Sequence, residues 1–169
     1  MTTLLVRERT EADIPCCADA LVAVHAVDGY PVEGVADPQA WLRPSTIIQA
    51  WVAELDGHVV GHVLLTEPTA TDAAAVMWLT DHPGEHAQLA VAGRLFVHPE
   101  GRGHSLGRRL MQAAFAYAED TGLRVALDVM EKDQVAIGLY EKLGLLRIGT
   151  AQHDDGHGNL IPAICYVTP

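Results

Sequence analysis

The part of the sequence that decides the fold is one continuous run from a strand through a glycine-rich loop into a helix. It reads Leu95-Phe96-Val97-His98-Pro99-Glu100-Gly101-Arg102-Gly103-His104-Ser105-Leu106-Gly107-Arg108. A helix N-terminus presents unpaired backbone N–H groups and a partial positive charge, and glycines let the backbone come close to a ligand. Arg102 and Arg108 add charge-assisted donors to the same segment. The run therefore predicts an anion-binding loop, and its geometry favours a pyrophosphate.

The distribution of charge along the chain supports this interpretation. The formal net charge is −11, from 11 Lys and Arg against 22 Asp and Glu. Residues 1–93 hold three basic residues against 13 acidic ones, whereas four arginines fall between Arg94 and Arg109 with Glu100 as the only acid. A chain this acidic repels phosphate backbones and anionic lipid, so we expect neither nucleic acid nor a membrane surface as a partner. The arginine cluster instead suits a small anion.

Length and composition indicate one globular domain. The chain has 169 residues, of which 49% are hydrophobic, so we expect a single domain over residues 1–169. The longest apolar run, residues 73–79, is far shorter than the roughly 20 residues of a membrane helix. The N-terminal residues carry charges where a signal peptide is apolar, which predicts a cytoplasmic protein.

The spacing of cysteine and histidine predicts neither a disulfide framework nor a metal site. Cys16, Cys17 and Cys165 give an odd count with no CxxC pair. Two histidine pairs have HxxxH spacing, at positions 82 and 86 and at positions 153 and 157. Pro83 and Gly84 in the first pair, and Gly156 in the second, break the helix that would align the imidazoles, so we expect no bound metal.

Hydrophobic periodicity predicts an α+β fold, with a central mixed sheet flanked by helices. Asp56-Gly57 between two β-rich runs is a strong hairpin signal, and Gln152 to Asn159 has the composition of a polar turn. Residues 68–88 are predicted to be a long connection that contains a short alanine-rich helix. The expected helices cover residues 11–27, 106–120 and 134–143, the first capped by Thr10 and the third by Asp133. The expected strands cover residues 4–9, 47–55, 58–65, 89–97, 123–129, 145–150 and 161–167.

A dinucleotide-binding fold is the main rival for the glycine-rich loop. Gly101, Gly103 and Gly107 form a loosened version of the glycine fingerprint, and Asp128 follows Gly107 by 21 residues, where a ribose-binding acid would lie. That fingerprint normally follows the first strand of a large parallel sheet. Here hairpins precede the loop and only 41 residues follow Asp128, so we consider this alternative weaker.

The loop resembles the acetyl-CoA loop of the GNAT N-acetyltransferases, which reads Arg/Gln-x-x-Gly-x-Gly/Ala after a strand ending in Val and often Pro. Arg102, Ser105 and Gly107 stand in those places, with Ser105 replacing a glycine. A second family motif is Leu-x-Val-x-x-x-Asn-x-x-Ala-x-x-Leu-Tyr-x-x-x-Gly-Phe. Its counterparts, in which Asp replaces Asn and Leu replaces Phe, are Leu127, Val129, Asp133, Ala136, Leu139, Tyr140, Gly144 and Leu145. The two motifs keep their usual separation, so the resemblance covers nearly the whole chain.

This resemblance implies a GNAT-like fold and direct transfer of an acetyl group from acetyl-CoA to the amine of a small acceptor. It implies that Tyr140 is the catalytic residue that donates a proton to the departing thiolate. The implied acetyl-CoA-binding residues are Leu95, Phe96, Val97, Arg102, Gly103, His104, Ser105, Leu106, Gly107, Arg108 and Asp133. Relatives of this kind often form homodimers, a state that composition alone does not predict.

An alkyl ammonium with a pKa of about 10.4 is almost fully protonated at pH 7, so amine attack requires a base or a water chain. The sequence assigns no base. Glu54, His62, Glu67 and His98 are candidates because they are expected near the centre of the sheet. The acidic balance of residues 1–93 favours a cationic amine as the acceptor. The alternative to an enzyme is a non-catalytic module that senses acyl-CoA, suggested by Ser105 and by the missing base.

Overall fold

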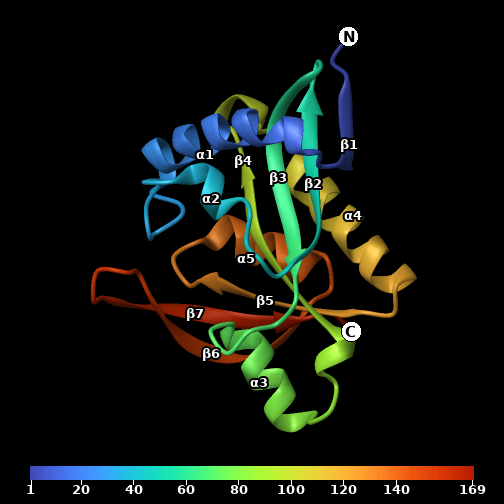
Figure 1. Cartoon of the computed structure of the whole chain (residues 1–169), viewed down its shortest axis with the longest axis vertical. Coiled ribbons are helices and arrows are strands. Elements are labelled where there is room, and N and C mark those ends of the chain that lie inside the picture. The colour runs from blue at the N-terminus through green and yellow to red at the C-terminus, as the bar shows by residue number, and fades with distance from the viewer. The chain divides into compact units, whose positions relative to one another are not determined.

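The computed structural model describes residues Met1–Pro169 and contains a seven-stranded sheet with the strand order β1-β2-β3-β4-β5-β7-β6 (Figure 1). The sheet is mixed, because β4 and β5 pair in parallel while the other assigned pairs are antiparallel. The α+β prediction is thereby confirmed. The strands are β1 (Leu4–Glu8), β2 (Ile47–Leu55), β3 (His58–Thr66), β4 (Leu89–Val97), β5 (Arg124–Met130), β6 (Leu146–Asp154) and β7 (Leu160–Val167).

Five α-helices and three short 3-10 helices accompany the strands. The α-helices are α1 (Ile14–Asp28), α2 (Pro38–Trp41), α3 (Ala73–Asp81), α4 (Leu106–Asp120) and α5 (Gln134–Lys142). The 3-10 helices are η1 (Glu11–Asp13), η2 (His86–Gln88) and η3 (Pro99–Gly101). None of the helices has the length and apolar character needed to cross a bilayer.

The chain divides into two compact units. One consists of Met1–Thr66 and Gly93–Ala116, and the other of Glu67–Ala92 and Tyr117–Pro169. The first unit contains β1 to β3, the second half of β4, α1, α2 and most of α4. The second unit contains the start of β4, β5 to β7, α3 and α5.

In the first unit, α1 and α4 cover opposite faces of the β2–β3 hairpin. Val52 and Phe96 belong to the core that α1 covers. A Cβ added at Gly61 would lie 3.1 Å from Leu110 of α4 and 3.2 Å from Ala53. Because successive strand residues point to opposite faces, Ala53 and Gly61 face α4 while their neighbours face α1. The absence of a side chain at Gly61 lets α4 approach the sheet closely.

In the second unit, α3 and α5 lie on opposite faces of β5 and β7. Ala74 and Ala75 of α3 share a core with Ala126 and Cys165. On the other face, the ring of Tyr140 in α5 lies 6.1 Å from the ring of Tyr166 in β7. The short alanine-rich helix predicted within residues 68–88 is confirmed as the nine-residue α3, which helps to form this core.

The predicted hairpin turn at Asp56-Gly57 is confirmed, and the predicted end of β6 is wrong. The β2–β3 hairpin turns at Asp56 and Gly57, which both have positive φ as a two-residue type I′ turn requires. The strand predicted to end at position 150 continues as β6 to Asp154, because its last residues pair with β7 up to Asp154↔Leu160. The polar turn is therefore shorter than predicted, and His153 lies in a strand.

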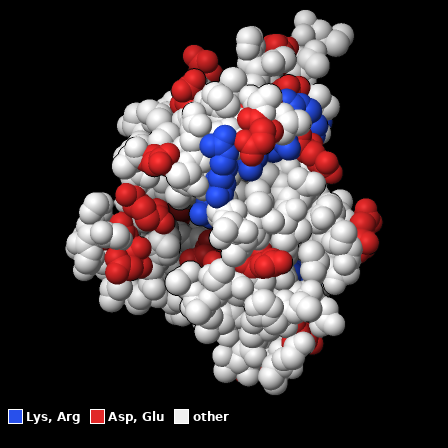
Figure 2. Space-filling view, in the orientation of Figure 1, with Lys and Arg blue, Asp and Glu red and all other residues white.

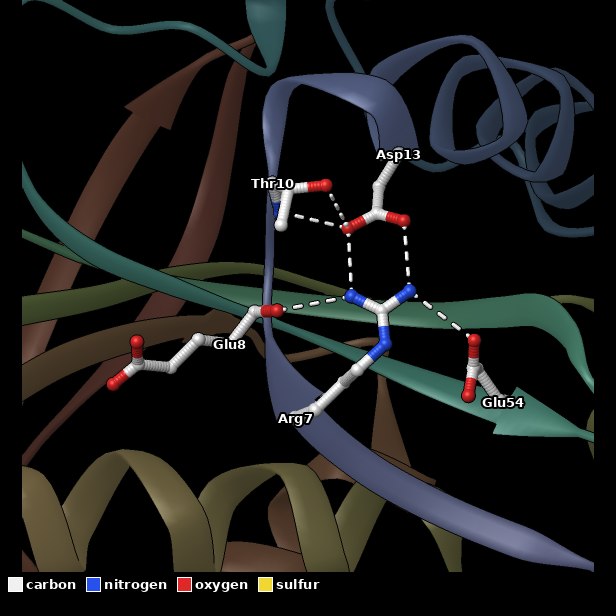
Figure 3. A network of polar contacts seen from close by, with 5 residues as sticks. All are labelled: Arg7, Glu8, Thr10, Asp13 and Glu54. Atoms are coloured by element: carbon white, nitrogen blue, oxygen red, sulfur yellow. Dashed lines mark hydrogen bonds and ion pairs between the residues drawn. The ribbon is translucent and has the colours of Figure 1, made fainter.

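A polar network ties β1 to the start of α1 (Figure 3). Both terminal nitrogens of Arg7 donate to the carboxylate of Asp13 at 2.8 Å, and one of them also pairs with Glu54. The same carboxylate accepts the N–H of Thr10 at 2.7 Å, which completes the capping interaction expected from the sequence. These donors lower the pKa of Asp13 to about 2, chiefly through the bond to Arg7.

We expect Asp13→Asn to lower the free energy of unfolding by about 1–3 kcal/mol, because Arg7 and Thr10 lose a charged acceptor at a largely buried site. Because the folded-state pKa of Asp13 is depressed, its contribution is present above pH 4 and is lost as the pH falls towards 2. Denaturant titration at pH 7 and pH 3 measures both effects. Glu11→Gln is the control, since Glu11 pairs with Arg43 at an exposed site and its loss should change stability little. Equal effects of the two variants would contradict the prediction.

Candidate active site

The glycine-rich loop follows β4 in the first unit and is shaped by close packing. Gly101 is buried, and a Cβ there would lie 2.9 Å from a methyl group of Val60, so no larger residue fits without displacement. Gly103 has φ +83°. Ser105 has φ +57°, a left-handed conformation that serine rarely adopts. A glycine adopts this conformation without steric cost, so the position suits the glycine that stands there in the motif that the loop resembles.

The loop ends at the N-terminus of α4. The carbonyl of Ser105 accepts the N–H of Arg109 at 3.1 Å, so helical hydrogen bonding begins there and the N–H groups of the first turn have no partner within the helix. Arg108 and Arg109 are exposed in this first turn, which contains no acid. Cations are unfavourable at the positive end of a helix dipole, and a bound anion removes that penalty.

Arg102 is held at the entrance of the loop. Its guanidinium pairs with Asp28 at the end of α1, and its Nε donates to the carbonyl of Val97 at 3.3 Å. Both side chains of the ion pair are about 40% exposed, as their relative areas of 42% and 41% show, so an incoming anion can reach the guanidinium. In the view of Figure 2, most of the visible basic groups gather in the upper half of the molecule, where acidic groups lie among them, and further acidic groups are spread over the rest of the view.

The second half of β4 forms the edge of the sheet within the first unit. Arg94 has φ +53°, which interrupts the regular strand, and parallel pairing with β5 ends before it, at Val91↔Ala126. Beyond Arg94, the N–H of His98 donates to Val60 of β3. Because strand residues direct their backbone groups alternately to the two edges, Leu95 and Val97 direct theirs away from β3. The carbonyl of Val97 accordingly reaches Arg102.

Tyr140 lies in the second unit with a buried ring and an accessible hydroxyl. The residue as a whole is 7% exposed, and no hydrogen bond to its hydroxyl is formed within the chain. No buried side-chain oxygen of the protein is left without a partner, so this hydroxyl must reach the surface. Burial raises its pKa, and the charges of Asp133 and Asp128 raise it further. The group is therefore a protonated donor at neutral pH.

Asp133 caps α5, as predicted. Its Oδ1 accepts the N–H of Ala136 at 3.3 Å, and the residue is exposed at the helix N-terminus. The structure thus brings together the predicted residues of the loop and strand, 95–97 and 102–108, in the first unit. It places Tyr140 and Asp133 in α5 and its cap in the second unit.

Three of the four candidate bases take part in other polar contacts within the fold. Glu54 pairs with Arg7, and Nδ1 of His98 accepts the N–H of Glu100. His62 is fully buried, both of its ring nitrogens have partners, and burial lowers its pKa to about 3. Glu67 is exposed in the loop after β3.

A further pair of titratable residues lies on the sheet of the second unit. Nδ1 of His153 in β6 lies 4.0 Å from the carboxylate of Asp128 in β5, and both side chains are about 30% exposed, at 31% and 28%. Asp128 is paired in register with Cys165, so it faces α3, on the opposite face of the sheet from Tyr140. The sequence contains one signal for this pair, which is the acid Asp128 within the apolar run of β5. Its histidine partner could not be predicted, because His153 belongs to β6 only through the extension of that strand beyond position 150.

Comparison with known proteins identifies the family. The profile of the acetyltransferase (GNAT) family matches residues 18–145 of the chain. The chain belongs to the GNAT acetyltransferase family. This family comprises acyltransferases, and the match covers both motifs noted in the sequence.

Individual relatives agree with the GNAT assignment. Mycothiol acetyltransferase from Rhodococcus jostii is 31% identical over 116 residues, which cover 66% of this chain and 33% of that protein. The chain thus spans about a third of the length of this curated relative. A GCN5-related N-acetyltransferase from Kribbella flavida has a TM-score of 0.70 and 25% identity, covering 98% of this chain and 97% of that one. A structure of yncA from Salmonella typhimurium with its cofactor acetyl-CoA has a TM-score of 0.73 and 16% identity, covering 98% of this chain and 93% of that one.

Proposed function

We propose that residues 1–169 form a single acetyltransferase domain that transfers the acetyl group of acetyl-CoA to a primary amine of a small acceptor. The observation that carries this proposal is the loop after β4. It combines a glycine that packing requires, two left-handed residues, an arginine at its entrance and two arginines at the positive end of α4. Such a loop fits a pyrophosphate.

The loop residues have distinct roles in this proposal. The backbone N–H groups of Gly103, His104, Ser105, Leu106, Gly107 and Arg108 surround the pyrophosphate, and Arg102 pairs with it in place of Asp28. Asp133, at the cap of α5, contributes a further polar contact to the CoA. Leu95 and Val97 hold the pantetheine and the acetyl group through the backbone groups that point away from β3, and the N–H of Leu95 polarises the thioester oxygen. Phe96, whose backbone points to β3 and whose side chain is buried, supports them by holding this part of β4 in place.

The reaction forms a C–N bond between the amine and the acetyl carbon and breaks the C–S bond of the thioester. Tyr140 stabilises the departing thiolate by donating a hydrogen bond from its accessible hydroxyl. The raised pKa of Tyr140 lies above the value of about 8.5 for a thiol, so hydrogen bonding is favoured over complete proton transfer. The proton that neutralises the thiolate comes in the end from the amine.

Asp128 and His153 are the groups that we propose to accept the amine proton. Oδ2 of Asp128 lies 4.0 Å from Nδ1 of His153, an ion-pair distance once the imidazole has taken up a proton, and the pair lies on the opposite face of β5 and β7 from Tyr140. In this proposal, the acceptor loses its proton on one face of β5 while the thiolate is stabilised from the other. The acceptor itself is proposed to be a cationic amine because residues 1–93 are strongly acidic. A homodimer and a cytoplasmic location stay predictions.

The first experiment is isothermal titration of the protein with acetyl-CoA, CoA and NADH at low salt. We expect binding of the two CoA species and none of NADH. Arg102→Ala should weaken acetyl-CoA binding by about 1–3 kcal/mol, because a charge-assisted contact to pyrophosphate is lost. Asp28→Asn is the matched variant and should leave affinity equal or tighter, since it removes the competing carboxylate. NADH binding, or equal affinity of wild type and Arg102→Ala, would contradict the assignment of the loop.

Tyr140→Phe separates an acetyltransferase from a module that only senses acyl-CoA. We expect this variant to lower kcat at least about tenfold, within the range of a lost proton or hydrogen-bond donor, while acetyl-CoA affinity stays nearly unchanged. Steady-state kinetics with a panel of amines measures the loss, and titration measures the affinity. Tyr166→Phe is the control, because its hydroxyl bonds only to Glu141 and its ring lies beside Tyr140. Unchanged turnover in Tyr140→Phe would remove Tyr140 from the mechanism.

Asp128→Asn and His153→Gln test the proposed base. We expect kcat/KM to fall about 100-fold at pH 7 in either variant. The deficit should shrink as the pH rises, because the free amine then increases up to tenfold per pH unit. The control is Asp154→Asn, on the neighbouring residue of β6, whose carboxylate accepts the N–H of Gly156. A loss that is constant from pH 7 to pH 9 would argue against proton removal by this pair.

A further inference from the structure

Four hydrogen bonds in the first unit form a closed ring around the irregular residue of β4. Nε of Arg94 donates to the carbonyl of Trp41 at 2.6 Å, and the carbonyl of Arg94 lies 2.9 Å from Nδ1 of His62. Nε2 of His62 lies 3.0 Å from Nη1 of Arg9, which donates to the carbonyl of Leu42 at 2.7 Å. Trp41 and Leu42 are consecutive residues at the end of α2, so the ring is closed by a peptide bond.

Chemistry fixes the direction of every hydrogen bond in this ring. A guanidinium can only donate, so Nε2 of His62 accepts from Arg9. The proton of the neutral imidazole then lies on Nδ1 and is donated to the carbonyl of Arg94. Full burial keeps His62 neutral, which agrees with its strongly lowered pKa. The two hydrogens of Nη1 in Arg9 are donated to the carbonyl of Leu42 and to Nε2 of His62, so this nitrogen has no donor left for another partner.

The ring holds a backbone conformation that arginine does not favour. Arg94 has φ +53°, and a strained residue of this kind persists only where its surroundings fix it. Here the backbone is fixed by His62 and the side chain by Trp41, whose ring also lies 4.9 Å below the guanidinium carbon. The next N–H along the chain is that of Leu95, which points away from β3.

We propose that His62 is a positioning residue, which fixes the left-handed conformation of Arg94 and thereby aims the N–H of Leu95. The catalytic importance of that N–H rests on the proposed function. The ring also couples the end of α2 to β4, because Trp41 and Leu42 supply two of its acceptors. A rearrangement of α2 therefore changes the direction of the Leu95 N–H without any contact between them.

A pair of His62 variants separates positioning from packing. Asn places its amide nitrogen near the position of Nδ1 and keeps the donor to Arg94, whereas Gln reaches the position of Nε2 and keeps only the acceptor for Arg9. Both variants lose the stacking of the imidazole on Phe96, whose ring lies 5.3 Å away at 18°. A packing role therefore predicts equal effects, and a positioning role predicts that Gln is worse.

The first readout needs no activity and uses the backbone amide resonances of the protein without ligand. We expect His62→Gln to shift the Arg94 and Leu95 signals and His62→Asn to leave them nearly in place. The second readout is kinetic: kcat should fall at least tenfold in His62→Gln and less than threefold in His62→Asn, with acetyl-CoA affinity unchanged in both. Unmoved signals in His62→Gln, or equal kinetic losses in the two variants, would overturn the proposal.

The two readouts keep this proposal distinct from the proposed function. Shifted amide signals in His62→Gln together with a wild type that neither binds nor turns over acetyl-CoA would support the ring and refute the function. Arg94→Gln covers the case in which the His62 variants do not fold, because Arg94 is partly exposed and its loss opens the ring at Trp41. It should shift the Leu95 signal in the same way, and an unmoved signal would overturn the proposal.

Discussion

The left-handed backbone of Arg94 is the constraint on which the arrangement of β4 depends. Before it, the residues from Leu89 to Val91 pair in parallel with β5. After it, β4 runs along β3 and leads into the loop at Pro99. A regular strand would keep both neighbours along its whole length and would use all of its backbone groups in the sheet. The interruption leaves the outward backbone groups of Leu95 and Val97 outside the sheet, and the proposed function uses them to hold the thioester.

The arginines of the chain divide into those that pair with carboxylates and those that lie in a turn without an acid. Arg7 is matched by Asp13 and Glu54, and Arg43 is matched by Glu11. Arg108 and Arg109 instead lie at the positive end of α4, in a turn without an acid. The first arrangement stabilises the fold, whereas the second is unfavourable until an anion binds. Arg102 is intermediate, because Asp28 holds it in an exposed pair that an anion can replace.

Local pattern predicted the elements around the loop because their determinants are local. β4 and α4 have the predicted bounds, since a β-rich run ends at a proline and an apolar stripe ends before Gly122. The pattern predicts α3 only as a short helix within a connection, because its sequence is apolar on nearly every side and gives no clear helical period. The end of β6 was missed because polar residues such as Gln152 and His153 are held in the strand by pairing with β7.

The sequence by itself determined the fold class, the loop with its glycines and arginines, and the place of Tyr140 in a family motif. These depend on short-range spacing, which a single chain displays directly. Only the tertiary structure decided which groups meet: Arg102 with Asp28, Asp128 with His153, and His62 with Arg9 and the carbonyl of Arg94. The partners in these contacts are between 25 and 74 residues apart in the chain, so strand register and packing bring them together and no local signal predicts them.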